Sequence, residues 1–173
     1  MTDVGVVRQT AVWRTTRDAE YALQHVPDGD PIQPGRSVVV AVTHFLPANA
    51  GVVLTVERAD GAVDVVGRCE PADAGWALEH HLARTGGRLV VFPGSDLLVG
   101  TMTVADLLEV SAVDEVVGIG AQPVDPATPC DTQSFVRPTF DEGVVRLLVR
   151  PAAGGRVIPF EQPNPTPCCA EHP

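Results

Sequence analysis

The sequence contains no lysine, and its 12 basic residues, all of them arginine, are outnumbered by 22 acidic residues. The formal net charge is therefore −10 at pH 7. Nucleic-acid backbones and anionic membrane surfaces both bind clustered positive charge, so this balance argues against either as a partner. The missing lysine, together with abundant Val, Ala, Gly, Pro and Asp, is typical of GC-rich coding sequence and points to a high-GC bacterium.

Long apolar runs are absent as well. No stretch approaches the ~20 apolar residues that a transmembrane helix needs, and residues 1–10 lack the charged-then-apolar pattern of a secretion signal. We therefore expect a cytoplasmic protein, in which cysteines are normally thiols or metal ligands. The motifs of a phosphate-cradling loop, a dinucleotide site and a serine nucleophile elbow are also missing.

The sequence does contain enough apolar material for a core. A chain of 173 residues that is 45% hydrophobic can fold without help from metal or disulfides. We expect one α+β domain over residues 1–162, followed by a tail over residues 163–173 that is rich in proline and cysteine. Because of its prolines, this tail should be extended and close to polyproline II.

Residues 71–100 are the expected centre of the fold. Residues 71–85 predict an amphipathic helix, with Pro71 in its first turn and Gly86 near its C-terminal cap. The short apolar segment 89–92 predicts the central strand of a sheet, with the helix lying across it.

Other elements are predicted on both sides of this centre. Thr15 with Asp18, and Thr103 with Asp106, have the spacing of capping boxes and predict two short helices. An Asp-Gly pair at 60–61 lies between two β-branched runs and predicts a hairpin. The expected strands cover residues 4–16, 37–45, 52–57, 62–67, 113–119, 143–150 and 156–160, and residues 121–132 are expected to form a proline-broken loop. Together these elements predict a mixed, largely antiparallel sheet of about six to eight strands, with hairpins.

The tail holds the densest group of metal-binding residue types, Cys168, Cys169 and His172. Adjacent thiolates bind one tetrahedral ion poorly, since zinc knuckles separate their cysteines by about two to four residues. One thiol of the pair could nevertheless hold zinc or iron together with His172 and Cys130. The fourth ligand would come from one of three other histidines: His44, His80 or His81. A redox or conjugation role for the thiol pair and an ordinary tail are the alternatives.

His80 and His81 are adjacent in the predicted helix and point about 100° apart, so they cannot address one site from the same face. The four-residue spacing of two metal-binding histidines on a helix is missing. We expect His81, on the apolar face, to be a hydrogen-bonded core residue and His80 to lie at the surface. His44, near the end of a β-branched strand, is expected to be a core residue, and Cys69 a small buried hydrophobe.

Two further polar segments are candidate sites. Ser95 and Asp96 follow the predicted central strand, at the end where α/β proteins often place ligands, and a helix histidine could come near as a base. A plain turn with a capping residue is the simpler interpretation. Arg137 follows a polar segment and could bind an anion in a pocket, or it could be an ordinary surface arginine.

The sequence favours a non-catalytic function. An acidic surface, hairpins with edges that can pair and an extended tail are typical of an accessory or structural subunit that docks on a larger protein, and homo-oligomers are a further option. The alternative is a small metal- or thiol-dependent enzyme or sensor that uses the C-terminal Cys/His cluster. The two hypotheses differ in whether the tail folds back to bring its cysteine and histidine to Cys130 and a helix histidine.

Overall fold

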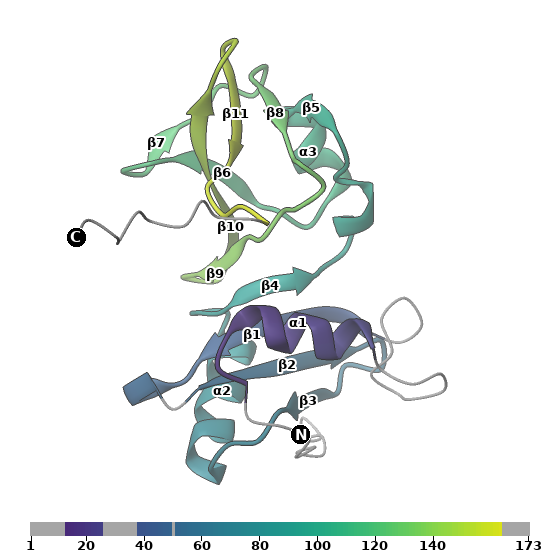
Figure 1. Cartoon of the computed structure of the whole chain (residues 1–173). Helices are drawn as coiled ribbons and strands as arrows, with labels where there is room; N and C mark the ends of the chain where they lie inside the picture. Colours follow the sequence, from purple (N-terminus) through teal and green to yellow (C-terminus); the bar gives the residue numbers. More distant parts are fainter. Residues whose placement is uncertain (1–12, 26–37, 50, 164–173) are drawn as a thin grey trace, which may run out of the picture.

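The computed structural model describes residues 13–25, 38–49 and 51–163 (Figure 1). Its helices are α1 (Thr16–Gln24), α2 (Pro71–Ala83) and α3 (Val104–Val110), with short 3-10 turns η1 (Pro47–Asn49) and η2 (Ser95–Leu97). Its strands are β1 (Val38–Phe45), β2 (Val52–Arg58), β3 (Val63–Val66), β4 (Arg88–Val91), β5 (Thr101–Thr103), β6 (Glu115–Gly118), β7 (Gln122–Pro123), β8 (Pro129–Asp131), β9 (Thr139–Asp141), β10 (Val144–Ala152) and β11 (Arg156–Pro159). The chain is thus an α+β protein with a mostly antiparallel sheet and hairpins, as predicted.

The described strands form one continuous sheet in the order β3-β2-β1-β4-β9-β10-β11-β8-β5, with β6 and β7 branching from β10. There are eleven strands in this part of the chain, more than the expected six to eight, because several are only two to four residues long. Strand β4 joins the two halves of the sheet: it pairs with β1 on one side and, at Arg88, with β9 on the other. The segment predicted as the central strand does take a central place.

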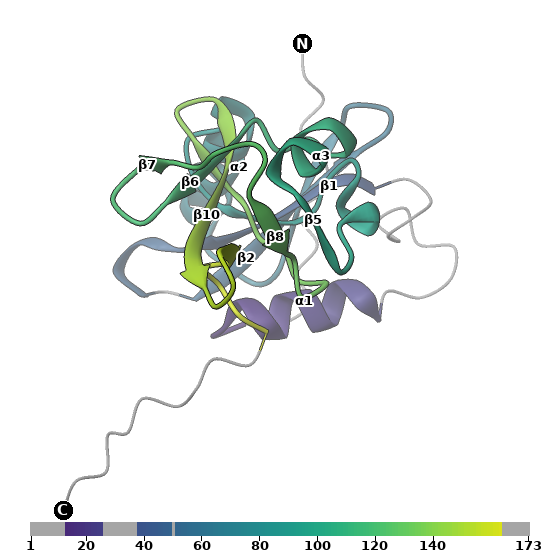
Figure 2. The ribbon, with the colours of Figure 1, turned by 90° about the horizontal axis from the view of Figure 1, so that it is seen from above.

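Helices α1 and α2 cover opposite faces of the N-terminal half, as the view from above shows (Figure 2). The alternation along β2 explains this arrangement. One face packs Leu54 against Leu23 of α1, whereas Val53 on the other face packs against Ala77 of α2. Helix α2 therefore packs mainly on β2 and β3. The prediction that it lies across the strand at 89–92 was wrong in this respect.

The helix boundaries follow from local chemistry. Both predicted capping boxes are present: Thr15 and Asp18 open α1, and Thr103 and Asp106 open α3. Pro71 stands in the first turn of α2 as predicted, but the helix ends two residues early, with Arg84 at its C-cap in the left-handed region (φ 52°). The predicted position of this cap, near Gly86, was wrong.

The predicted hairpin at Asp60-Gly61 joins β2 to β3. The Gly61 amide donates to the Arg58 carbonyl, and the Arg58 amide donates to the Ala62 carbonyl, so the loop has three residues, Ala59 to Gly61. Gly61 takes the left-handed conformation (φ 82°) that such a loop requires, and the Asp60 carboxylate accepts from the Ala62 amide.

The C-terminal half is organised by β10. This strand pairs antiparallel with β9 and β11 and parallel with β6, and its inward side chains Val145, Leu147 and Val149 enter the largest hydrophobic cluster. The predicted final hairpin is confirmed as β10–β11. The predicted loop over residues 121–132 instead contains the short strands β7 and β8, whose prolines suit a sheet margin.

Two predictions fall wholly or partly outside the described residues. Of the strand predicted over residues 4–16, only residues 13–16 are described: Trp13 forms a bridge to Val52, and α1 already begins at Thr16. Of the tail over residues 163–173, only Pro163 is described.

Candidate functional site

A chain of polar side chains runs through the interior between β1, β2 and α2. The Thr55 hydroxyl lies 2.8 Å from His44 Nε2 and 2.8 Å from His81 Nδ1. His81 Nε2 in turn lies 3.4 Å from a carboxylate oxygen of Glu57. Three of these four side chains are buried, with Thr55 0%, His44 1% and His81 3% exposed. Only Glu57 reaches the surface.

The register of the sheet brings these residues together. Thr55 is opposite Val42 in the β1–β2 pair, so His44 and Thr55 are diagonal neighbours on the face that α2 covers. His81 reaches the same point from the last turn of α2. Gly87 completes the enclosure, since a Cβ at this position would lie only 2.4 Å from Val42 and 2.7 Å from the His44 ring.

The donor and acceptor at each step can be assigned from the Glu57 end. A carboxylate only accepts, so His81 Nε2 carries a proton and donates to Glu57. Neutral His81 then accepts from the Thr55 hydroxyl at Nδ1, and that hydroxyl oxygen accepts from His44 Nε2. This assignment leaves His44 Nδ1 as a bare acceptor, and this atom is buried without a hydrogen-bond partner.

The two buried histidines are held neutral. Burial lowers the pKa of His44 to about 3, helped by the charges of His81 and His80. Burial also lowers the pKa of His81, although the hydrogen bond and charge of Glu57 oppose the shift. A hydroxyl, an imidazole and a carboxylate in this order could serve nucleophilic catalysis. Here the hydroxyl is closed off from substrate, so the arrangement serves the core.

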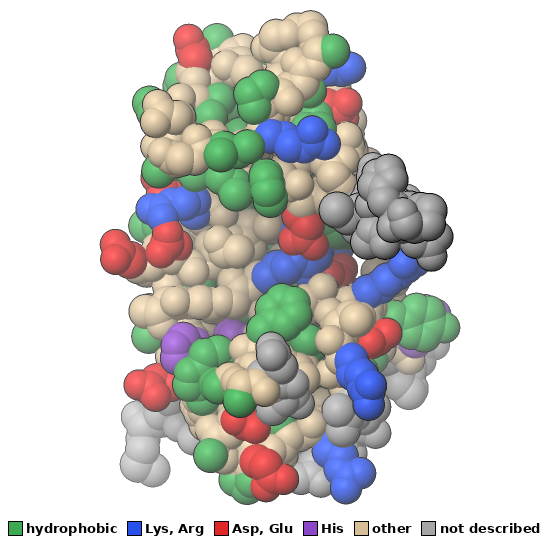
Figure 3. Space-filling view, turned by 60° about the vertical axis from the view of Figure 1, so that its left-hand side comes forward, with side chains coloured by type: hydrophobic (Ala, Val, Ile, Leu, Met, Phe, Trp, Pro, Cys, Tyr) green, Lys and Arg blue, Asp and Glu red, His purple; other side chains and the backbone are tan. Residues whose placement is uncertain are grey.

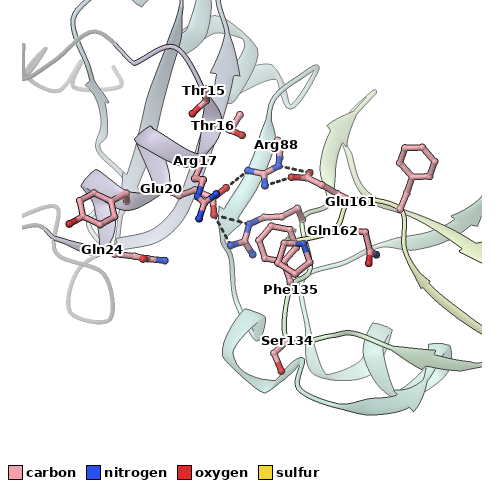
Figure 4. Close-up of a pocket in the computed structure, with 14 residues that line it drawn as sticks. Thr15, Thr16, Arg17, Glu20, Gln24, Arg88, Ser134, Phe135, Glu161 and Gln162 are labelled. Atoms are coloured by element: carbon pink, nitrogen blue, oxygen red, sulfur yellow. Dashed lines mark hydrogen bonds and ion pairs between the residues drawn. The ribbon is translucent and has the colours of Figure 1, made fainter. Parts of the chain in front are cut away.

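The second polar cluster lies in an open groove at the junction of the two halves (Figure 4). The groove has a volume of about 1030 Å³ and lies between α1, residues 134–137 and residues 160–163. Its centre is the guanidinium of Arg88, which donates through Nη1 to Glu20 and through Nε and Nη2 to both oxygens of Glu161. This bidentate contact is the strongest geometry for an arginine–carboxylate pair.

Arg137 forms the other half of this cluster. Its Nη2 donates to the second oxygen of Glu20 at 2.7 Å, its Nη1 donates to the Val136 carbonyl at 2.9 Å, and its guanidinium carbon lies 4.2 Å from the Phe135 ring centroid. Glu20 therefore bridges two arginines with a single carboxylate.

The arginines also fix the ionisation of the acid. Burial by itself would raise the pKa of Glu20, but the hydrogen bonds and charges of Arg137 and Arg88 outweigh it, and the net shift is downward. The pKa of Arg88 is raised by Glu161 and Glu20 against the opposing effect of its burial. Glu20 is thus a carboxylate and Arg88 a guanidinium cation at neutral pH.

The structure brings some of the residues singled out in the sequence together and separates others. His44 and His81 meet at Thr55, whereas His80 lies apart, with Nδ1 2.9 Å from the Trp76 carbonyl and its ring 4.1 Å from the indole. Arg137 lies in the groove. The metal hypothesis stays a prediction, because three of its ligands lie outside the described residues: Cys168, Cys169 and His172.

Cys130 and the Ser95–Asp96 pair have ordinary structural surroundings. Cys130 lies in β8 rather than in a loop, is fully buried in the main core, and has its pKa raised to about 11 by burial and by Asp131. The Ser95 hydroxyl accepts from the Phe92 amide at 3.4 Å within the η2 turn, and Asp96 is exposed. Cys69, expected to be buried, is half-buried between β3 and α2.

Several residues of the two clusters were missed in the sequence: Thr55, Glu57, Glu20, Arg88, Phe135 and Glu161. Thr55 and Glu57 carried a usable signal, because these two polar residues stand at a spacing of two in an otherwise apolar run and therefore share a face with each other. The groove residues carried none, since Glu20 and Arg137 are 117 positions apart.

The described part of the chain contains no group of three or more His, Cys, Asp or Glu side chains arranged to hold a metal ion. Among the described helices, none has the length and apolar character that a membrane crossing requires. The chain matches no model of a known protein family, no curated protein and no solved structure.

Proposed function

We propose that this chain is a non-catalytic, protein-binding accessory subunit that docks on a larger partner through the outer face of its C-terminal sheet. The observation that carries the proposal is a row of apolar residues across β7, β6 and β10 that continues to Phe160, the residue after the end of β11. Pro123 pairs with Val117, Val117 pairs with Leu148, and the Phe160 amide donates to the Leu148 carbonyl. Residues opposite each other in a sheet share a face, so these four side chains form one strip.

This apolar row lies on solvent-facing surface. Phe160 is 52% exposed and Leu148 37% exposed, and Ile119, just beyond β6, is 57% exposed. Their strand neighbours Leu147 and Val149 point to the opposite side, into the core. Figure 3 shows hydrophobic side chains gathered in the upper half of this view, where β6, β10 and β11 lie. Arg146 and Arg150 flank Leu148 on this face of β10, so the row is an apolar strip with a charged rim, an arrangement found in surfaces that another protein covers.

The partner is a different protein rather than a second copy. A chain with a net charge of −10 repels its own copies, whereas a partner of opposite charge is attracted to it. The same charge disfavours nucleic acid as the partner. The cytoplasm suits this subunit, because Cys69 and Cys130 are free thiols.

The polar clusters support a non-catalytic function too. The only hydroxyl–imidazole–carboxylate series in the described residues is centred on Thr55, which is inaccessible. The alternative function, a metal- or thiol-dependent enzyme or sensor, depends on tail residues that are not described. Cys130 does not favour it, since a buried thiol with a raised pKa is a poor nucleophile and a poor metal ligand at neutral pH.

The test compares two exposed leucines. A photo-crosslinking amino acid is placed at position 148 or at position 97, and the captured protein is identified by mass spectrometry and purified. Its affinity is then measured for the wild type, Leu148→Ser and Leu97→Ser. Leu97 is 54% exposed but lies in η2, away from the row, and is the matched control.

We expect capture from position 148 only, and a loss of affinity of about tenfold or more for Leu148→Ser alone. Equal capture from position 97, unchanged affinity of Leu148→Ser, or a second copy of this chain as the captured protein would each contradict the proposal.

A further inference from the structure

The arginine groove differs in chemistry from the apolar row, although Phe160 borders both, and the charged residues of the groove take no part in the proposed docking. One side of the groove is a fixed arginine pair. Arg88 is held by β4 between β1 and β9, and its carbonyl accepts from the Thr43 hydroxyl at 3.2 Å. Arg137 is held by the Phe135 ring and the Val136 carbonyl. The side chains of Arg88 and Arg137 are only 11% and 15% exposed.

The group that occupies this pair is less firmly held. Glu161 is 41% exposed and lies two residues beyond the end of β11. Among the described residues 160–163, its carboxylate is the side chain that ties the segment to the groove, since Gln162 donates only to the nearby Pro159 carbonyl. Figure 4 shows Glu161 entering from the C-terminal side, opposite Glu20.

The charges show that Glu161 fills a site for one further anion. Arg88 and Arg137 carry two positive charges, and Glu20 supplies one negative charge that both arginines share. Without Glu161, this pair would keep one uncompensated positive charge, to which Arg17 on the groove wall adds another, and the Nε–Nη2 edge of Arg88 would offer two parallel donors. A carboxylate matches such an edge in shape and charge.

The walls of the groove indicate what accompanies that anion. Phe135 and Phe160 line it along with Tyr21, and Gln24 and Ser134 add neutral hydrogen-bonding groups. Aromatic side chains beside the bidentate edge of Arg88 favour a ligand whose carboxylate is attached to an apolar group.

We propose that the groove is a binding site for the carboxylate of a small apolar acid or of a peptide end, and that Glu161 occupies this site within the free chain. The ligand carboxylate displaces Glu161 and accepts from Nε and Nη2 of Arg88. Glu161 thereby lowers the affinity of the free chain, because only the fraction with an open site can bind.

The test uses N-acetyl-L-phenylalanine as the probe, with its amide and inorganic phosphate for comparison, in an NMR-detected titration. The proteins are the wild type, Glu161→Gln, Glu161→Gln with Arg88→Lys, and the control Glu115→Gln. Glu115 is a partly exposed glutamate like Glu161 (39% and 41%), and it pairs with Arg146, away from the groove. The arginine-to-lysine change keeps the charge but removes the two-pronged edge.

We expect Glu161→Gln to bind the probe about tenfold more tightly than the wild type, and Glu115→Gln to bind as the wild type does. Arg88→Lys in the Glu161→Gln background should reverse the gain, and the amide and phosphate should bind more weakly than the acid. If the Arg88→Lys variant does not fold, the affinities of Glu161→Gln and Glu115→Gln for the probe are sufficient to test the inference.

Three results would overturn the inference. The first is no gain for Glu161→Gln, which would make Glu161 a purely structural tie. The second is an equal gain for Glu115→Gln, which would reflect net charge alone. The third is equal or tighter binding of the amide or of phosphate, which would exclude a carboxylate site.

Discussion

The interior chain His44–Thr55–His81 and the groove cluster Arg88–Arg137–Glu20–Glu161 both connect distant elements of the fold through polar side chains. They differ in charge and in exposure to solvent. The interior chain is neutral, and burial lowers the pKa values of both histidines. The groove cluster is built from ion pairs, and its outermost member, Glu161, keeps 41% of its side chain exposed.

The difference separates a structural role from a binding role. A closed, neutral chain of hydrogen bonds stabilises one packing arrangement and admits no ligand. An open charged pair can exchange its own carboxylate for another. Mutations should therefore affect folding most in the interior and ligand binding most in the groove.

The largest effect on stability is expected for Gly87→Ala. The new methyl group would meet Val42 at 2.4 Å and the His44 ring at 2.7 Å, at a backbone φ of 103°. Clash and strain together should cost about 3 kcal/mol or more in urea unfolding. Gly61→Ala is the control, because Gly61 also has positive φ (82°) but has open space around its Cβ position. Equal losses for the two variants would show that the enclosure of His44 is unimportant.

The next largest effect is expected for Thr55→Val. This change leaves the His44 and His81 nitrogens that face the hydroxyl without a partner inside the core, which should cost about 2–3 kcal/mol. Thr43→Val, at a position that is also buried, removes only one hydrogen bond to the Arg88 carbonyl and should cost about 1 kcal/mol. Denaturant unfolding of both variants measures the difference. A larger loss of stability for Thr43→Val than for Thr55→Val would contradict the stabilising role of the interior chain.

Acid should destabilise the protein through the same histidines. The unfolded chain binds a proton at His44 near pH 6.5, whereas the folded chain does so only near pH 3. Below pH 6.5 the unfolded state thus holds more protons, so stability falls as the pH falls. Between pH 7.5 and pH 5.0 His44 alone should remove about 2 kcal/mol, and His81, with its pKa lowered too, adds to the loss.

Unfolding free energies across this range provide the measurement. His44→Asn should flatten the pH dependence. A slope that survives His44→Asn would mean that other groups set the acid sensitivity.

The smallest effects are expected in the groove. Glu20→Gln removes the negative charge that compensates two largely buried guanidinium groups, and it should lower the free energy of unfolding by about 1–2 kcal/mol. Glu161→Gln removes a more exposed partner and should cost less than about 1 kcal/mol. Urea midpoints of the two variants test this order. The reverse order would make Glu161 a principal structural contact rather than a displaceable one.

The elements that the sequence predicted well depend on neighbours in the chain. A capping box needs only Thr15 and Asp18, or Thr103 and Asp106, and both are present as predicted. The helix that starts at Pro71 and the hairpin around Gly61 are local in the same sense. The missed C-cap at Arg84 shows the limit, since left-handed conformation at a non-glycine residue has little sequence signal.

The contacts that define the two clusters are not local. The parallel pairing of β6 with β10 and the placement of α2 over β2 and β3 depend on the whole sheet. The Arg88–Glu161 pair joins positions 73 apart, and any of the chain's acidic residues could have been the partner on sequence grounds. Arg137 could be named as an anion-binding candidate, but its neighbours could not.

The most direct test of the distinction between the clusters is one NMR titration of Glu161→Gln with N-acetyl-L-phenylalanine, recorded on arginine Nε–H and histidine ring signals together. We expect the Arg88 signal to shift in a saturable way while the His44 and His81 ring signals stay unchanged. Shifts of the histidine rings with an unmoved Arg88 signal would contradict the distinction, because the interior chain would then be the accessible site.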